Sequence, residues 1–193
     1  TLGVYLDSTA GTQVVSFDRD KSTLTGIVSS IAIHVLSTGG TLGVRVGQID
    51  GTTAFYLHST GGTLGVNVGK IEGTTAIFLQ GTGGTLGVRV GQIDGSASVY
   101  LSGTAGTLGV RVGQIDGSIA VHLVGTGGTL GVDVGKINDN VSVKFASVAG
   151  TAGVNLGKVD GTIQVNVGKI SDTIAIWLTG TSGTLNVRLA DNS

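Results

Sequence analysis

The residue types that usually carry out chemistry are few in this chain, and they stand far apart. Its histidines are His34, His58 and His122, and none has a second histidine or a cysteine at the spacing of a zinc site. His122 and Asp133 are residue types that form catalytic pairs, but no partnering nucleophile is evident in the sequence. We therefore expect no catalytic residue, no metal ligand and no cofactor, and we do not expect an enzyme.

An Ile-Asp-Gly sequence recurs along the chain, for example at Asp50 and Asp94, and raises the question of calcium. The GGxGxDxUx pattern of calcium-binding repeats is absent. One carboxylate per repeat also supplies too few oxygen ligands for a calcium ion. Aspartate and glycine are common in tight turns, so we interpret these residues as turn residues.

The strongest candidate for a binding surface is a row of residues that recurs at intervals of 11, in which aromatic residues alternate with arginine or asparagine. The row contains Arg45, Tyr56, Asn67, Phe78, Arg89, Tyr100, Arg111, His122, Trp177 and Arg188. Rings that alternate with hydrogen-bonding groups suit stacking on sugars. They also suit a ladder of cation–π contacts that needs no ligand. Both interpretations stay open at this point.

The elements that would position this row belong to an internal repeat of 22 residues. Thr-Leu-Gly-Val opens units at Thr41, Thr63, Thr85, Thr107 and Thr129, and a Thr-Ala-Gly-Val variant opens one at residue 151. Each unit holds two runs in which apolar and other residues alternate, and many of the apolar residues are β-branched. This pattern predicts two β-strands per unit, and the abundant glycine argues against helix.

Two-residue turn signals between the runs favour hairpins. A turn at residues 50–51 places Val44 opposite Leu57 and Val46 opposite Phe55, so the same face of both strands is apolar. The glycine pair at residues 61–62 has the same effect on the next strand. We therefore predict an all-β fold, a repetitive antiparallel β-meander with an 11-residue strand-turn period and about 17 strands. This register also places Asp133 beside His122 and Lys144 as a cross-strand charge ladder.

One face of this predicted sheet, which we call face A, is apolar throughout. It includes Val44, Val46, Phe55, Leu57, Val66, Val68, Ile77, Leu79, Val88 and Val90. A single-layer meander cannot shield so large an apolar surface from water. We therefore expect an obligate homo-oligomer, with a trimer favoured, in which several chains bury face A in a β-prism or in stacked sheets. A β-barrel pore is a further alternative, although the apolar band is short for a membrane.

The repeat also predicts how the chain is divided. We expect an irregular N-terminal hairpin and loop at residues 1–30, a continuous array of β-hairpins at residues 31–189, and a tail at residues 190–193. The hairpin would turn at Ala10-Gly11, and residues 18–26 interrupt the period as a longer loop.

The composition excludes some classes of partner. The 193 residues include 36 glycines but no proline, cysteine or methionine, and the formal net charge is −1. The basic residues do not cluster, which argues against nucleic acid as a partner. No signal peptide or long apolar run is visible, so we do not expect a membrane-spanning helix or a membrane partner.

The repeated short strands and glycine-rich turns from Thr41 to Arg188 resemble the repetitive β-meander shafts of phage tail-fibre and other virion fibre proteins. The resemblance lies in architecture and repeat style, and bacterial surface repeats and filament subunits are similar as well. It implies a structural, non-catalytic role in an extended fibre at a virion surface or outside a cell. The competing interpretation is an adhesion module in which the row described above recognises a surface glycan or a receptor.

Overall fold

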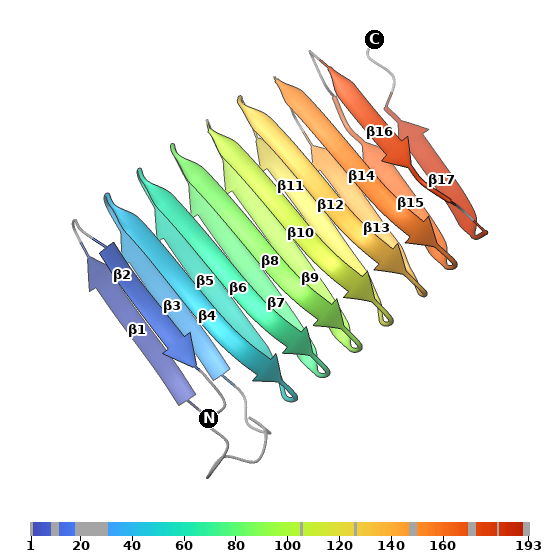
Figure 1. Cartoon of the computed structure of the whole chain (residues 1–193). Coiled ribbons are helices and arrows are strands. Elements are labelled where there is room, and N and C mark those ends of the chain that lie inside the picture. The colour runs from blue at the N-terminus through green and yellow to red at the C-terminus, as the bar shows by residue number, and fades with distance from the viewer. Residues whose placement is uncertain are drawn as a thin grey trace.

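The chain folds into two β-sheets that lie against each other (Figure 1). The computed structural model describes residues 2–8, 12–17, 31–104, 106–125, 127–146, 150–169, 173–180 and 182–190. Within this part the regular elements are all β-strands. The prediction of an all-β chain built from tandem repeats is therefore confirmed.

The two sheets divide the strands by odd and even number. The sheet that we call the odd sheet contains, in spatial order, β1 (Leu2–Ser8), β3 (Ile31–Ser37), β5 (Thr53–Ser59), β7 (Thr74–Gly81), β9 (Ser96–Gly103), β11 (Ile119–Gly125), β13 (Val141–Ala146), β15 (Thr162–Val167) and β17 (Thr184–Leu189). The even sheet contains β2 (Thr12–Phe17), β4 (Thr41–Ile49), β6 (Thr63–Ile71), β8 (Thr85–Ile93), β10 (Thr107–Ile115), β12 (Thr129–Ile137), β14 (Thr151–Val159) and β16 (Ile174–Leu178).

Every strand pair in these sheets is parallel, so the predicted antiparallel β-meander is wrong. Arg45 pairs with Asn67 in the even sheet, and Tyr56 pairs with Phe78 in the odd sheet, each 22 residues along the chain. Strands that follow one another in sequence lie in different sheets. The chain is therefore a β-solenoid in which each 22-residue turn contributes one strand to each sheet (Figure 1).

The parallel register differs from the hairpin that was predicted at the N-terminus. β1 pairs with β3, and β2 pairs with β4, so β1 and β2 belong to different sheets. The predicted hairpin turn at Ala10-Gly11 and the predicted loop at residues 18–26 lie outside the described residues. Within residues 31–189 the repeat predicted from the sequence continues as turns of the solenoid, and most of the predicted tail lies outside the described part.

Face A forms the interior of the solenoid. Its residues project from both sheets into the space between them, and each of them is at most 5% exposed, from Val44 and Val46 to Val88 and Val90. Burial of each such side chain contributes about 1.5–3 kcal/mol to stability. One chain covers its own apolar face, so the argument that an oligomer is needed to bury it, as a prism or as stacked sheets from several chains, does not hold.

Glycine makes the close stacking of successive turns feasible. At Gly62, where φ is +92°, a Cβ atom would lie 1.9 Å from the carbonyl oxygen of Gly40 in the preceding turn. At Gly91 a Cβ atom would lie 2.4 Å from the carbonyl oxygen of Gly69. The pairing of β8 with β10 passes from Val90 directly to Gln92, so Gly91 and its neighbour Gly113 are both outside it. Both sites exclude any side chain.

A matched pair of substitutions tests this stacking. Gly91→Ala should lower the free energy of unfolding by about 1–3 kcal/mol, because its methyl group meets backbone atoms that have no room to move. Gly87→Ala, four residues earlier in β8, meets nothing within 4 Å and should leave stability unchanged or raise it by up to about 1 kcal/mol. Urea unfolding followed by circular dichroism measures both values. Equal effects at the two positions would contradict the parallel stacking.

Candidate functional site

The parallel register divides the predicted row between the two outer faces of the solenoid. The outer face of the odd sheet carries His34, Tyr56, Phe78, Tyr100, His122, Lys144, Asn166 and Arg188. The outer face of the even sheet carries Arg45, Asn67, Arg89, Arg111, Asp133, Asn155 and Trp177. The mixed row of rings and arginines predicted from the sequence is therefore not formed, because its alternate members lie on opposite sides of the molecule.

On the odd sheet the rings form a continuous ladder. Phe78 and Tyr100 stack with ring centroids 4.8 Å apart and an angle of 2° between their planes, and Tyr5 stacks on His34 at 5.1 Å. Tyr56 bridges these two pairs at 6.2 Å from His34 and from Phe78. Each such pair contributes roughly 0.5–1.5 kcal/mol beyond the area it buries. The rings contact one another, so the stacked ones have less free surface for a sugar, and the ladder stabilises the sheet without a ligand.

His122 ends this ladder in an unusual environment. Its ring meets Tyr100 edge-on at 5.1 Å, and Lys144 is its neighbour on the other side. Its Nε2 atom is buried, and no described residue gives it a hydrogen bond. Burial, and then the positive charge of Lys144, lower the pKa of His122 below the ordinary value of 6.5. Asp133, its predicted partner, lies on the even sheet.

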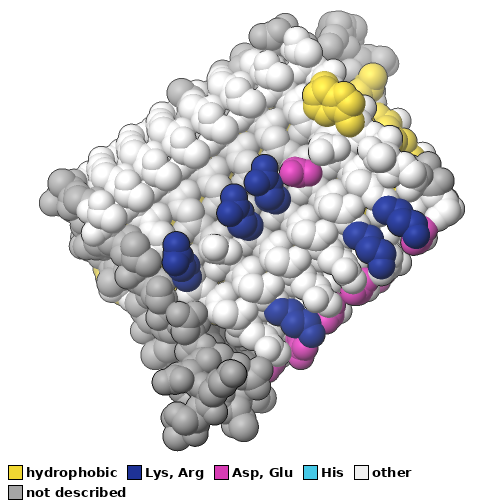
Figure 2. Space-filling model, in the orientation of Figure 1, with side chains coloured by type: hydrophobic (Ala, Val, Ile, Leu, Met, Phe, Trp, Pro, Cys, Tyr) yellow, Lys and Arg dark blue, Asp and Glu magenta, His cyan; other side chains and the backbone are white. Residues whose placement is uncertain are grey.

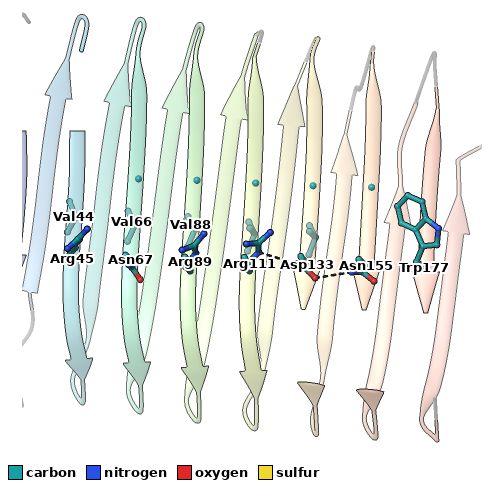
Figure 3. Close-up of a pocket in the computed structure, with 17 residues that line it drawn as sticks. Val44, Arg45, Val66, Asn67, Val88, Arg89, Arg111, Asp133, Asn155 and Trp177 are labelled. Carbon is teal, nitrogen blue, oxygen red and sulfur yellow. Dashed lines mark hydrogen bonds and ion pairs between the residues drawn. The ribbon is translucent and has the colours of Figure 1, made fainter. Parts of the chain in front are cut away.

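On the even sheet the polar residues form a short network. Arg111 Nε donates a hydrogen bond to Asp133 Oδ2 at 3.1 Å, and Asn155 Nδ2 donates to Asp133 Oδ1 at 3.2 Å (Figure 3). The Arg111–Asp133 pair replaces the predicted contacts of Asp133 with His122 and Lys144. Arg45 and Arg89 form no ion pair with any carboxylate of the described residues.

A shallow groove of about 670 Å³ runs along this outer face, across the strands. Gly65, Gly87, Gly109 and Gly131 form its floor, the arginine and asparagine side chains border it, and Trp177 lies at one end (Figure 3). A Cβ atom on any of these four glycines would meet nothing within 4 Å. Glycine within a strand costs roughly 0.5–1 kcal/mol relative to alanine. The packing of the chain does not explain why glycine occupies the floor.

A second line of charges follows the corner of the even sheet (Figure 2). Lys70 binds Glu72 and lies 2.9 Å from Asp94, and Gln92 donates a hydrogen bond to Asp94 at 2.7 Å. The hydrogen bonds from Lys70 and Gln92 lower the pKa of Asp94. The stacked carboxylates of successive turns are thus held by lysine and amide groups of the chain, and Asp50 is held in the same way by Gln48 at 2.7 Å.

The described residues form neither a metal-binding cluster nor a membrane-spanning helix. No group of three or more histidine, cysteine, aspartate or glutamate side chains in that part is placed to hold a metal ion. No helix that is long and apolar enough to cross a membrane occurs there. Comparison of the chain with protein-family models, with curated proteins and with solved structures gives no match.

Sequence reasoning named the residues of both outer faces but missed their separation. The sequence does contain a signal for this separation: residues 22 apart are more alike than residues 11 apart. Arg45, Arg89 and Arg111 differ by multiples of 22, and so do Tyr56, Phe78 and Tyr100. In-register parallel stacking brings each of these sets onto one face. The groove and its glycine floor also follow from this stacking.

The environment of His122 gives a prediction for its titration. Lys144→Gln removes a positive charge and should raise the pKa of His122 toward 6.5, but not fully to it, because burial is the larger cause of the lowered value and remains. In the wild-type protein the unfolded chain binds the proton more readily, so stability should fall as the pH drops below about 6.5 toward the folded-state pKa. Proton NMR of the histidine rings measures this pKa.

His58 provides the internal control, because it lies four strand spacings, about 19 Å, from Lys144 along the odd sheet. At a fixed neutral pH its ring resonances should have the same chemical shifts in both proteins. If the His122 curve is also unchanged by the substitution, Lys144 does not lie beside it and the register of β11 and β13 is wrong.

Proposed function

We propose that this chain is a structural, non-catalytic repeat protein that forms a segment of an extended fibre or filament, at a virion surface or outside a cell. The observation that carries the proposal is the in-register stacking of nearly identical turns. Leu64 pairs with Leu42 on one side and with Leu86 on the other, and Val66 repeats the pattern. A fold of this kind grows along one axis without changing its cross-section.

The dimensions of the solenoid suit a spacer. Its nine-stranded sheet has eight strand spacings of about 4.8 Å, which give a length of about 38 Å. The core continues from turn to turn, so adding turns lengthens the rod without exposing more apolar surface. Each inner strand is also hydrogen-bonded along both edges, which makes bending of the rod costly.

Contacts between turns at the corners support the same role. Thr60 Oγ1 donates a hydrogen bond to the carbonyl oxygen of Thr38 at 3.0 Å. Thr82 binds Thr60 in the same way at 2.9 Å, and Thr104 binds Thr82 at 3.0 Å. The polar groups named here thus bind the preceding turn, and the rings of the odd sheet likewise bind one another.

Insertion of whole repeat units tests the proposal. A variant in which residues 85–128, two complete units, are duplicated in tandem should fold and should be longer than the wild type by two spacings, about 9.6 Å. Small-angle X-ray scattering measures the maximum dimension, and electron microscopy shows whether the particles are straight rods.

The matched control duplicates only residues 85–95, which is half a unit. In the solenoid this insertion moves every later strand into the wrong sheet, so the variant should unfold or aggregate. An antiparallel array with an 11-residue period would accept it. The spacer role is excluded if the 44-residue duplication folds but the particle is compact and no longer than the wild type.

A further inference from the structure

The outer face of the even sheet carries a ridge that no described residue covers (Figures 2 and 3). The ridge consists of one residue from each of seven successive strands, β4 to β16, in the order Arg45, Asn67, Arg89, Arg111, Asp133, Asn155 and Trp177. Rows of glycine run on both sides of it, with Gly87 on one side and Gly91 on the other. The ridge side chains therefore project from a nearly flat surface.

The order of residues along this ridge is complementary about its centre. One turn to either side of Arg111 lie a cation and an anion, Arg89 and Asp133. Two turns away lie two amides, Asn67 and Asn155, and three turns away lie Arg45 and Trp177. Each residue thus has, at the same distance on the other side of the centre, a residue whose chemistry it can bind.

We propose that this face is an interface between two copies of the chain, related by a two-fold axis that runs parallel to the strands and passes through Arg111. Such an axis makes the two solenoids run in opposite directions along their lengths, and it places the ridge of one copy against the ridge of the other. Arg89 then meets Asp133 of the second copy, Asn67 meets its Asn155, and Arg45 meets its Trp177. Each of these three contacts occurs twice, as an isologous interface requires.

The pairing of Arg89 with Asp133 across the axis supports a second copy as the occupant. Asp133 accepts single hydrogen bonds from Arg111 and Asn155 of its own chain, and a carboxylate has about four acceptor sites, so it has capacity for Arg89 of the other copy. Arg111 meets itself at the axis, where the Asp133 of each chain offsets its charge. Arg45 would lie over the indole of Trp177, which is 60% exposed and binds cations through its ring face.

The glycine floor of the groove gains an explanation in this arrangement. Glycine in a strand often marks the close approach of another backbone or a ligand, and the chain itself does not require glycine at residues 65, 87, 109 and 131. Where the two ridges meet, floors without side chains on both copies leave space beside the ridges into which the long arginine and tryptophan side chains can bend. Trp177 already leans over this row, since a Cβ atom at Gly153 would lie 3.7 Å from its Cζ3 atom.

The alternative occupant is an anionic glycan chain that lies along the groove beside Arg45 and Arg89. Asp133 would repel such a chain, because it presents a negative charge on the ridge. The symmetric order of residues about Arg111 would also have no role in binding a glycan. The interface with a second copy uses all seven residues. It does not depend on the proposed spacer role, although in a fibre it would pair two rods side by side in opposite directions.

A charge exchange on the full chain tests the interface. Arg89→Asp and Asp133→Arg should each weaken the dimer measured by sedimentation equilibrium by about tenfold or more, because each brings two like charges together twice. The double variant restores opposite charges and should regain most of the affinity. Lys144→Asp, a charge reversal on the outer face of the odd sheet, should leave the dimer unchanged. Circular dichroism confirms that each variant is folded.

The register is tested with cysteines, since the chain has none of its own. Asn67→Cys and Asn155→Cys leave every charge of the ridge in place. When the two variants are mixed, a bismaleimide with a spacer of about 10 Å, the usual separation of stacked sheets, should link one chain to the other. Neither variant alone should be linked, because in a dimer of identical variants the two cysteines lie about four strand spacings, some 19 Å, apart.

Three results would overturn the proposal. The first is a wild-type chain that stays monomeric at all concentrations up to its solubility limit. The second is a dimer that the double variant does not restore. The third is a monomer that binds dextran sulfate, used as an anionic polysaccharide probe, through Arg45 and Arg89, which would assign the groove to a glycan.

Discussion

The rest of this structure depends on the in-register parallel stacking of 22-residue turns. Stacking in this register places each residue directly beside its equivalents in the turns before and after it, as Leu42, Leu64 and Leu86 show in the even sheet. The distance between equivalent backbones is fixed at about 4.8 Å. A position where a Cβ atom would meet the backbone of the preceding turn is therefore occupied by glycine in successive turns, as at Gly69, Gly91 and Gly113. Gly62, Gly84 and Gly106 form a second row of this kind.

The same constraint acts on the surface, where like residues also meet like residues. It is favourable for rings, which stack on the odd sheet from Tyr5 to His122. It is unfavourable for charges, because like charges directly beside each other repel. The chain limits this repulsion by varying the charged rows. Lys70 stands among carboxylates at the corner, and Asp133 follows two successive arginines on the even sheet. In these two rows, variation between repeats places opposite charges beside each other, as in the Lys70–Asp94 and Arg111–Asp133 pairs.

Much of the fold was predictable from the sequence, and the physical reason for the error is specific. Alternation of apolar residues identified the strands and the buried residues, such as Val44 and Phe55, because it depends only on which face is inside. It cannot distinguish a hairpin from a solenoid coil, since both keep the same residues on the inner face. The pairs at Asp50-Gly51 and Gly61-Gly62 suit hairpin turns, but here they turn the chain from one sheet into the other. The likeness of Arg45 to Arg89, and of Tyr56 to Tyr100, was the available signal for the longer period.

The separation of the two outer faces changes which of them can interact with another molecule. On the odd sheet the rings already contact one another, and the neighbouring strands supply their partners. On the even sheet Arg45 and Arg89 have no carboxylate of the described residues to bind, and Trp177 is largely exposed. A cation at the surface of a folded chain is well hydrated and needs no partner for stability. Arg89, however, stands in a ridge between rows of glycine, and Asp133 lies at the same distance on the other side of Arg111. A surface that carries the same residues in the reverse order could therefore bind this ridge. Among the described residues the ridge itself has this order, and this is the basis of the proposed interface with a second copy.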